Sequence, residues 1–99
     1  MRIFFKRSGG FTGMQISTTI DTQELPPQES EQLYRFVEEA SFFELPPSPS
    51  NPGGADQFSY SLTVVEGARQ HTVEISDADA PDELRPLLRK LTQLARRAA

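Results

Sequence analysis

The sequence predicts an α+β domain in which a four-stranded antiparallel sheet carries both helices on one face, in the order ββαββα. Three observations support this fold class. Four segments alternate apolar and polar residues, two segments repeat apolar residues at helical spacing, and segments rich in glycine or proline separate them. A chain of 99 residues can bury one sizeable core, so we interpret residues 1–99 as a single domain.

The first two strands are predicted at residues 2–7 and 14–20. In the first strand, Ile3 and Phe5 share one face, as a period of two requires. One face of the second strand carries Met14, Ile16, Thr18 and Ile20. The glycine-rich connection between the two runs favours an antiparallel hairpin.

The first helix is predicted to begin at Pro27, because the first turn of a helix does not need the N–H group that proline lacks. Its apolar stripe consists of Leu33, Phe36, Val37 and Ala40. We expect the helix to end at about Ala40 or Ser41. The side chains of Phe42 and Phe43 are then expected to fold back onto the core.

A segment rich in proline and glycine, residues 46–56, is predicted to be an exposed loop between two ββα halves, because it suits neither a helix nor a central strand. A second hairpin follows, with its turn at Gly67. Its two strands alternate Phe58, Tyr60, Leu62 and Val64, and then His71, Val73 and Ile75. The open face of the sheet would carry Ser59, Ser61, Thr63, Thr72 and Glu74.

The last helix is predicted from an apolar stripe of Leu84, Leu87, Leu88, Leu91, Leu94 and Ala95. Asp79 is a candidate N-cap for this helix. Pro86 lies early in it, so either its first turn is distorted or the helix begins later. Basic residues lie off the stripe, namely Arg85, Arg89, Lys90, Arg96 and Arg97. Such a face is either simply solvated or a contact for nucleic acid or an acidic protein.

Composition excludes several function classes. The chain has no cysteine, which excludes disulfides, thiolate metal sites and cysteine nucleophiles. The net charge of −4 argues against the phosphate backbone of nucleic acid as the main partner. No apolar run approaches the roughly 20 residues that span a membrane, and the apolar run at the N-terminus is too short for a signal peptide. We therefore expect a cytoplasmic protein with no membrane contact.

No constellation of residues predicts catalysis. His71 is the one histidine, and it lies in phase with a strand core, where a structural role is the commoner one. An acidic cluster consists of Asp77, Asp79, Asp82 and Glu83, and helix capping explains it better than cation binding. No serine has a base at a recognisable spacing. We expect no catalytic residue, no bound metal and no cofactor. An enzyme that uses His71 and nearby acidic residues is kept as an alternative hypothesis for the function.

The first hairpin loop is the candidate partner-binding site. Its residues are Gly9, Gly10, Phe11, Thr12, Gly13 and Met14. Glycines allow a turn to adopt positive φ, but a turn that only reverses the chain needs neither a Phe nor a Met. These apolar side chains either pack onto the core or enter a pocket of a partner. Met14 is in phase to pack, whereas both alternatives stay open for Phe11.

Several short motifs resemble the emfourin family over nearly the whole chain. They include R-S-G-G-F-T-G-M at the first hairpin, L-P-P before the first helix, F-F-E-L-P-P after it, F-S-Y-S-L-T-V and H-T-V-E-I-S-D in the second hairpin, and A-P-D-E-L-R-P-L-L in the last helix. The family comprises small bacterial inhibitors of protealysin-type, thermolysin-like zinc metallopeptidases.

The resemblance implies a non-enzymatic inhibitor that carries no metal of its own and has a metallopeptidase as its partner. We expect the protein to be a monomer. We infer that the first hairpin loop occludes the active-site cleft, with Phe11 or Met14 in the pocket that binds the residue after the scissile bond. The alternative is a protein-interaction module that uses the open sheet face or the proline-rich loop.

Overall fold

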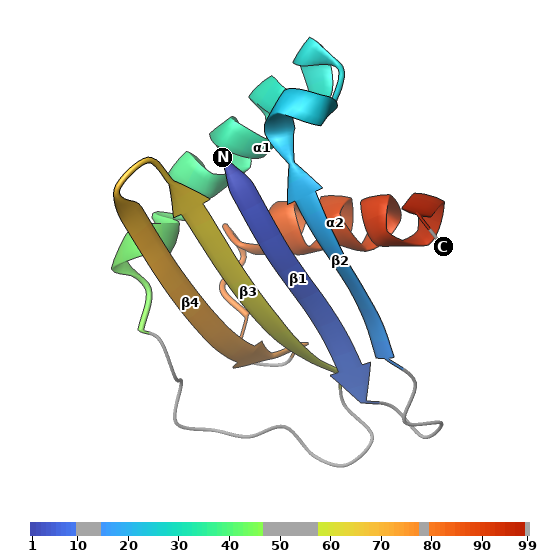
Figure 1. The fold of residues 1–99 in the computed structure, drawn as a ribbon. Coiled ribbons are helices and arrows are strands. Elements are labelled where there is room, and N and C mark those ends of the chain that lie inside the picture. The colour runs from blue at the N-terminus through green and yellow to red at the C-terminus, as the bar shows by residue number, and fades with distance from the viewer. Residues whose placement is uncertain (10–14, 47–57, 78–79, 99) are drawn as a thin grey trace.

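The computed structural model describes residues 1–9, 15–46, 58–77 and 80–98. It confirms the predicted fold class (Figure 1). Four strands form one antiparallel sheet in the order β2-β1-β3-β4. The strands are β1 (Arg2–Gly9), β2 (Gln15–Asp21), β3 (Phe58–Glu66) and β4 (Arg69–Ser76), and the helices are α1 (Pro27–Glu39) and α2 (Arg85–Ala98).

The two central strands, β1 and β3, join the two ββα halves. Their antiparallel pairing places Ile3 opposite Val64 and Phe5 opposite Leu62. These side chains are almost completely buried on the helix-facing side of the sheet. The alternation that predicted the strands therefore separates the core face from the open face, as it must when only one face is covered.

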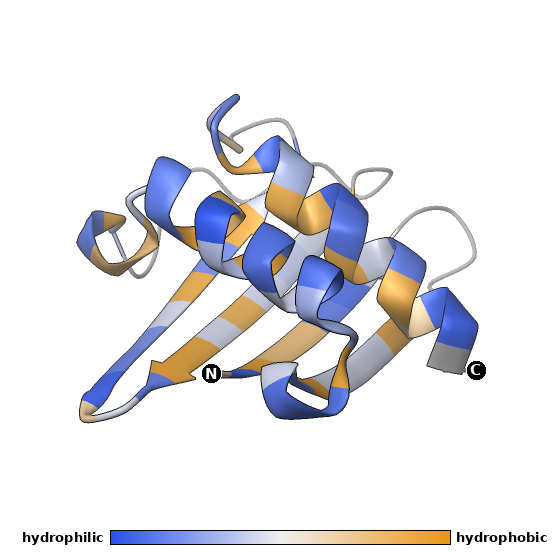
Figure 2. Ribbon diagram, turned by 90° about the horizontal axis from the view of Figure 1, so that it is seen from above, coloured by the Kyte–Doolittle hydropathy of each residue, from blue (hydrophilic) through white to orange (hydrophobic). Residues whose placement is uncertain are grey.

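Both helices lie on one side of the sheet (Figure 1). Helix α2 crosses behind the strands, and α1 lies next to α2. Figure 2 shows hydrophilic and hydrophobic bands alternating along each helix. Leu33 of α1 and Leu87 and Leu91 of α2 are fully buried, which confirms both predicted stripes. Burying a leucine side chain contributes about 2 kcal/mol relative to leaving it exposed. The helices are thus held mainly by their apolar faces.

The ends of α1 follow the prediction closely. The helix begins at Pro27 and is capped by Ala40 at its C-terminus. Ser41 then adopts a left-handed conformation with φ of 49°, and a short 3-10 helix, Phe42–Glu44, turns the chain back. Phe42 is fully buried as expected, while Phe43 is half-buried.

The expectation that Asp79 caps α2 is wrong, because α2 begins only at Arg85. The carbonyl of Leu84 accepts the hydrogen bond from the Leu88 N–H at 3.1 Å, so Leu84 precedes the helix although its side chain is fully buried. Pro86 explains the late start: it has no N–H, and the first turn is where a helix needs none. The alternative of a later start is confirmed; Asp79 itself lies outside the described residues.

The proline-rich loop at 46–56 is described only at Pro46, which is exposed; its other residues lie outside the described part of the chain. On the open face of the sheet, the predicted polar side chains are exposed or half-exposed. Within the described residues, neither helix has the length and apolar character needed to cross a membrane.

The turn of the second hairpin supports one prediction about stability. Gly67 has a φ of 59°, and a methyl group on its Cα would meet no heavy atom within 4 Å. Gly67→Ala should therefore cost about 1 kcal/mol through backbone strain alone. Gly67→Asn should cost less, because asparagine tolerates this conformation better. Urea unfolding of the two variants measures the difference; equal stability of the alanine variant and the wild type would contradict the strain.

A pair of contacts between the helices makes stability depend on pH. Glu29 of α1 accepts hydrogen bonds from Arg97 at 2.5 Å and Lys90 at 3.1 Å. These contacts lower the pKa of Glu29 below its ordinary value of 4.5, and the hydrogen bond from Arg97 has the largest effect. A lowered pKa in the folded state means that the carboxylate stabilises the fold above pH 4.5 and ceases to do so as pH falls through the lowered pKa.

We therefore expect Glu29→Gln to unfold more easily than the wild type at neutral pH, and the difference to shrink in acid. Thermal unfolding between pH 2 and 7 measures this, with those limits taken roughly around the window in which carboxylates titrate. Glu38→Gln is the matched control, since Glu38 is exposed on the same helix. A difference that persists unchanged in acid would show that the ion pairs do not cause it.

Candidate functional site

The first hairpin loop is anchored by backbone pairing at its base. Ser8 of β1 pairs with Gln15 of β2, and Gly9 continues β1 by pairing with Phe58 of β3. Gly9 has a φ of 113°, which side-chain-bearing residues rarely adopt, so the strand leaves the sheet at a glycine. Of the six predicted site residues, the structure places Gly9 alone. Residues 10–14 lie outside the described part of the chain.

A charged side chain lies beside this loop on the helix-facing side of the sheet. Arg7 is in phase with Ile3 and Phe5, and its neighbours across the sheet are Ile16 and Tyr60. Sequence reasoning missed it, although the period of two, continued by one step beyond Phe5, identifies its face. An arginine on a core face is unusual and asks for an explanation.

The surroundings of Arg7 are both aromatic and polar. Its guanidinium carbon lies 3.7 Å from the centre of the Phe58 ring, a cation–π contact. Its Nε atom is buried and has no hydrogen-bond partner among the described residues. A buried donor without a partner loses the hydrogen bond that water would give it.

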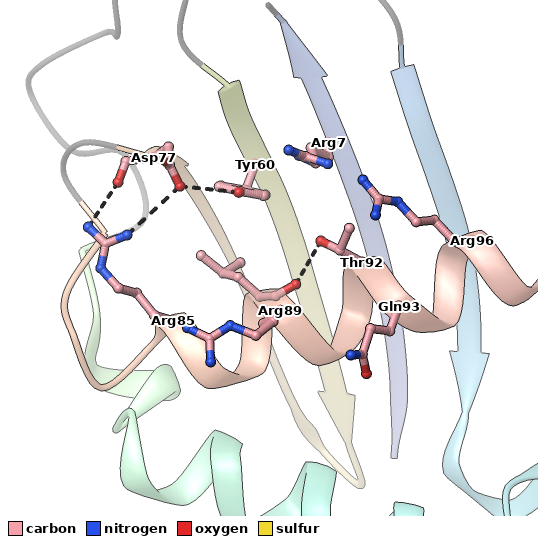
Figure 3. Close-up of a pocket in the computed structure, with 9 residues that line it drawn as sticks. Arg7, Tyr60, Asp77, Arg85, Arg89, Thr92, Gln93 and Arg96 are labelled. Carbon is pink, nitrogen blue, oxygen red and sulfur yellow. Dashed lines mark hydrogen bonds and ion pairs between the residues drawn. The ribbon is translucent and has the colours of Figure 1, made fainter.

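Arg7 lines a cavity of about 370 Å³ between the loop-bearing end of the sheet and α2 (Figure 3). We call this cavity the arginine pocket. Its charged and phenolic lining residues are Arg7, Tyr60, Asp77, Arg85, Arg89 and Arg96. The three arginines of α2 are spaced at about one and two helical turns, which places them along one side of the helix.

One end of the arginine pocket is internally neutralised. Arg85 donates to the backbone carbonyl of Asp77 at 3.2 Å, and its guanidinium lies 3.9 Å from the Asp77 carboxylate and 3.5 Å from that of Asp82. Tyr60 donates its hydroxyl to the Asp77 carboxylate at 3.2 Å. Burial raises the pKa of Tyr60, and the charge of Asp77 raises it further, so the phenol remains a donor.

Apart from Arg85, the predicted basic face of α2 divides into two groups. Lys90 and Arg97 pair with Glu29 of α1. Arg89 and Arg96 instead line the pocket and form no ion pair with any described residue, and the same is true of Arg7. The face is therefore not uniformly solvated: part of it binds the two helices together and part lines a cavity.

His71 has a packing role at the other end of the sheet. Its Nε2 atom lies 2.7 Å from the backbone carbonyl of Leu45, which can only accept, so Nε2 donates. The imidazole also packs against the rings of Phe42 and Phe43 at centroid distances of 5.6 and 6.4 Å. These contacts tie β4 to the turn after α1 and agree with the structural role expected for this residue.

The described members of the acidic cluster, Asp77, Asp82 and Glu83, do not form a cation site. Asp77 and Asp82 engage Arg85, and Asp79 lies outside the described residues. Across the ranges that the structure describes, no group of three or more histidine, cysteine or acidic residues is arranged to hold a metal ion.

Comparison with known proteins supplies the family. The model of the emfourin family matches residues 5–92. No curated protein and no solved structure matches the chain. The matched range includes parts of all four strands and of both helices, and it spans the first hairpin loop. The chain therefore belongs to the emfourin family, whose members are known as inhibitors of M4 metallopeptidases.

Proposed function

We propose that this protein inhibits a thermolysin-like zinc metallopeptidase by inserting its first hairpin loop, residues 9–14, into the active-site cleft. The observation that carries the inhibitor class is the family match over residues 5–92. The choice of the loop is our own inference from the sequence and from the pairing at the base of the loop.

The base of the loop favours tight docking. The Ser8–Gln15 and Gly9–Phe58 pairs hold both ends of the connecting segment on the rigid sheet. A segment held in this way loses less conformational freedom on binding than a free peptide does, which favours affinity. Backbone groups beside the loop can add main-chain hydrogen bonds along the cleft edge.

The chemistry of the loop fits a cleft that favours a bulky apolar side chain just after the scissile bond. Phe11 is the larger of the two apolar residues in the loop, and Met14 is the other. An aromatic side chain that fills a pocket is the kind of residue that dominates an interface. In this proposal the inhibitor binds the zinc enzyme without removing its metal.

The test is a titration of a purified thermolysin-like peptidase with this protein near equimolar concentration. We expect activity to fall linearly to zero at about one inhibitor per enzyme, as tight one-to-one binding requires. Added zinc should not restore activity, which distinguishes cleft occlusion from metal removal. A zinc peptidase of a different family serves as the control and should be unaffected. Full activity of several thermolysin-like peptidases at excess inhibitor would reject the proposal.

The open sheet face supports the second candidate, a protein-interaction module. Phe4 lies near the centre of this face, between Thr19 and Thr63 on the two neighbouring strands, and it is 41% exposed. The hydroxyl of Thr63 lies 2.8 Å from that of Thr72, a polar pair across the two strands of the second hairpin. In this candidate function, the exposed side chain of Phe4 would anchor the partner. Substitution of Phe4 separates this candidate from the loop mechanism.

A further inference from the structure

We propose that the arginine pocket binds an oxyanion, a phosphate or a carboxylate group, at the end lined by Arg7 and Arg96. This inference concerns a site separate from the loop residues and stands whether or not the protein inhibits a peptidase. It rests on three observations: arginines that no described acidic residue pairs with, a guanidinium group held in place by an aromatic ring, and a cavity of suitable size.

Part of the positive charge in the pocket is not balanced by the residues that the structure describes. Arg85 is engaged by Asp77 and Asp82, but Arg7, Arg89 and Arg96 form no ion pair with a described residue. The chain as a whole carries a net charge of −4, so this concentration of positive charge is local. Guanidinium groups that face one cavity repel one another, and an anion between them removes that repulsion.

The position of Arg7 points to the same conclusion. Its Nε atom is buried and has no hydrogen-bond partner among the described residues, and the rest of the side chain lines the pocket. The Phe58 ring, 3.7 Å from the guanidinium carbon, holds the group in place on a rigid central strand. A pre-positioned arginine loses little freedom when it binds, and its planar fork matches the oxygens of phosphate and carboxylate groups.

The arrangement of the pocket separates Asp77 from Arg7 and Arg96. Figure 3 shows Asp77 and Arg85 at one end and Arg7 and Arg96 at the other, with Tyr60 between them. The Asp77 carboxylate is held by Tyr60 and Arg85, so its charge is compensated where it lies. A cavity of about 370 Å³ is large enough for a phosphate or carboxylate group together with bridging water molecules.

The oxyanion can come from two sources, and both can reach the arginine pocket from the surface of the protein. A free anion such as inorganic phosphate is one source. The other is an acidic side chain of a bound protein, because Arg7 is two positions before Gly9, at the base of the first hairpin loop. A protein that contacts the loop would bring its own side chains close to the pocket.

The experiment is an NMR titration of the full-length protein that follows the Nε–Hε resonances of its arginines. One arm adds sodium phosphate and the other adds N-acetyl-Glu-Glu-amide, each against sodium chloride at equal ionic strength. We expect a saturable shift of the Arg7 resonance in at least one arm. Saturation by phosphate alone assigns a free anion, and saturation at lower concentration by the peptide assigns a protein carboxylate. Shifts that do not exceed those caused by sodium chloride in both arms would overturn the site.

A double variant tests whether the pocket itself is responsible. Arg89→Gln combined with Arg96→Gln removes two exposed cations and leaves the core intact. We expect this variant to bind the anion at least about tenfold more weakly, because charge-assisted hydrogen bonds are lost. The matched control is Lys6→Gln combined with Arg35→Gln, two exposed cations outside the pocket. Equal weakening in both double variants would show attraction by net charge alone and would overturn the proposal.

Discussion

Replacing Phe11 by aspartate is expected to weaken inhibition of the target peptidase at least about a hundredfold. An anchor residue typically contributes 2 kcal/mol or more, and each 1.4 kcal/mol changes affinity about tenfold. Aspartate additionally places an unpaired charge in an apolar pocket, which adds a desolvation cost. The measurement is the inhibition constant of the variant against a purified thermolysin-like peptidase.

Phe4→Asp is the matched control for this prediction. Phe4 is an exposed phenylalanine on the open face of the same sheet, so the chemical change is identical and only the surface differs. Inhibition should survive Phe4→Asp with the same affinity. Loss of inhibition in the Phe4 variant alone would show that the peptidase binds the open face of the sheet and not the first hairpin loop. Thermal unfolding of both variants is needed, because unfolding of the Phe11 variant would show that Phe11 is a core residue.

Phe42→Ala is expected to cost about 3–5 kcal/mol of stability, the range for removing a fully buried aromatic side chain. Phe42 is completely buried after the end of α1. Its ring meets Phe43 edge-on at 5.7 Å and His71 at 5.6 Å. Since small domains are stable by about 5–15 kcal/mol in total, this single change brings the protein close to its unfolding transition.

Phe43→Ala provides the comparison. Phe43 is half-buried, and Arg69 covers its ring with the guanidinium carbon 4.3 Å from the ring centre. Its removal should cost about 1 kcal/mol, because its cavity is open to solvent and the site can relax. Urea unfolding at neutral pH measures both variants. Equal losses of stability in the two variants would mean that Phe42 contributes no more to the core than Phe43 does.

Local pattern was sufficient to predict most of the elements. The alternation through Phe5 and Leu62 predicted central strands because a strand exposes its faces in turn. The stripe through Leu33 and Leu91 predicted helices because helical spacing gathers those residues on one side. The start of α1 at Pro27 was also predictable, since a proline acts on its own backbone.

The start of α2 was harder to predict, because two local signals disagreed. Asp79 as a capping residue and Leu84 in the apolar stripe favoured an early start, whereas Pro86 favoured a later one. The structure buries Leu84 in the turn before the helix, where it contributes to the core without helical geometry. Burial depends on where a side chain points in three dimensions, so periodicity cannot separate these two situations.

The sequence by itself determined the class of the fold, most of the core residues and the family, because each can be recognised from short patterns along the chain. Only the tertiary structure decided that β1 lies beside β3, that Glu29 pairs with the end of α2, and that Arg7 shares a cavity with Arg89 and Arg96. Those contacts join residues from distant segments, and their energies depend on distances that no local pattern records.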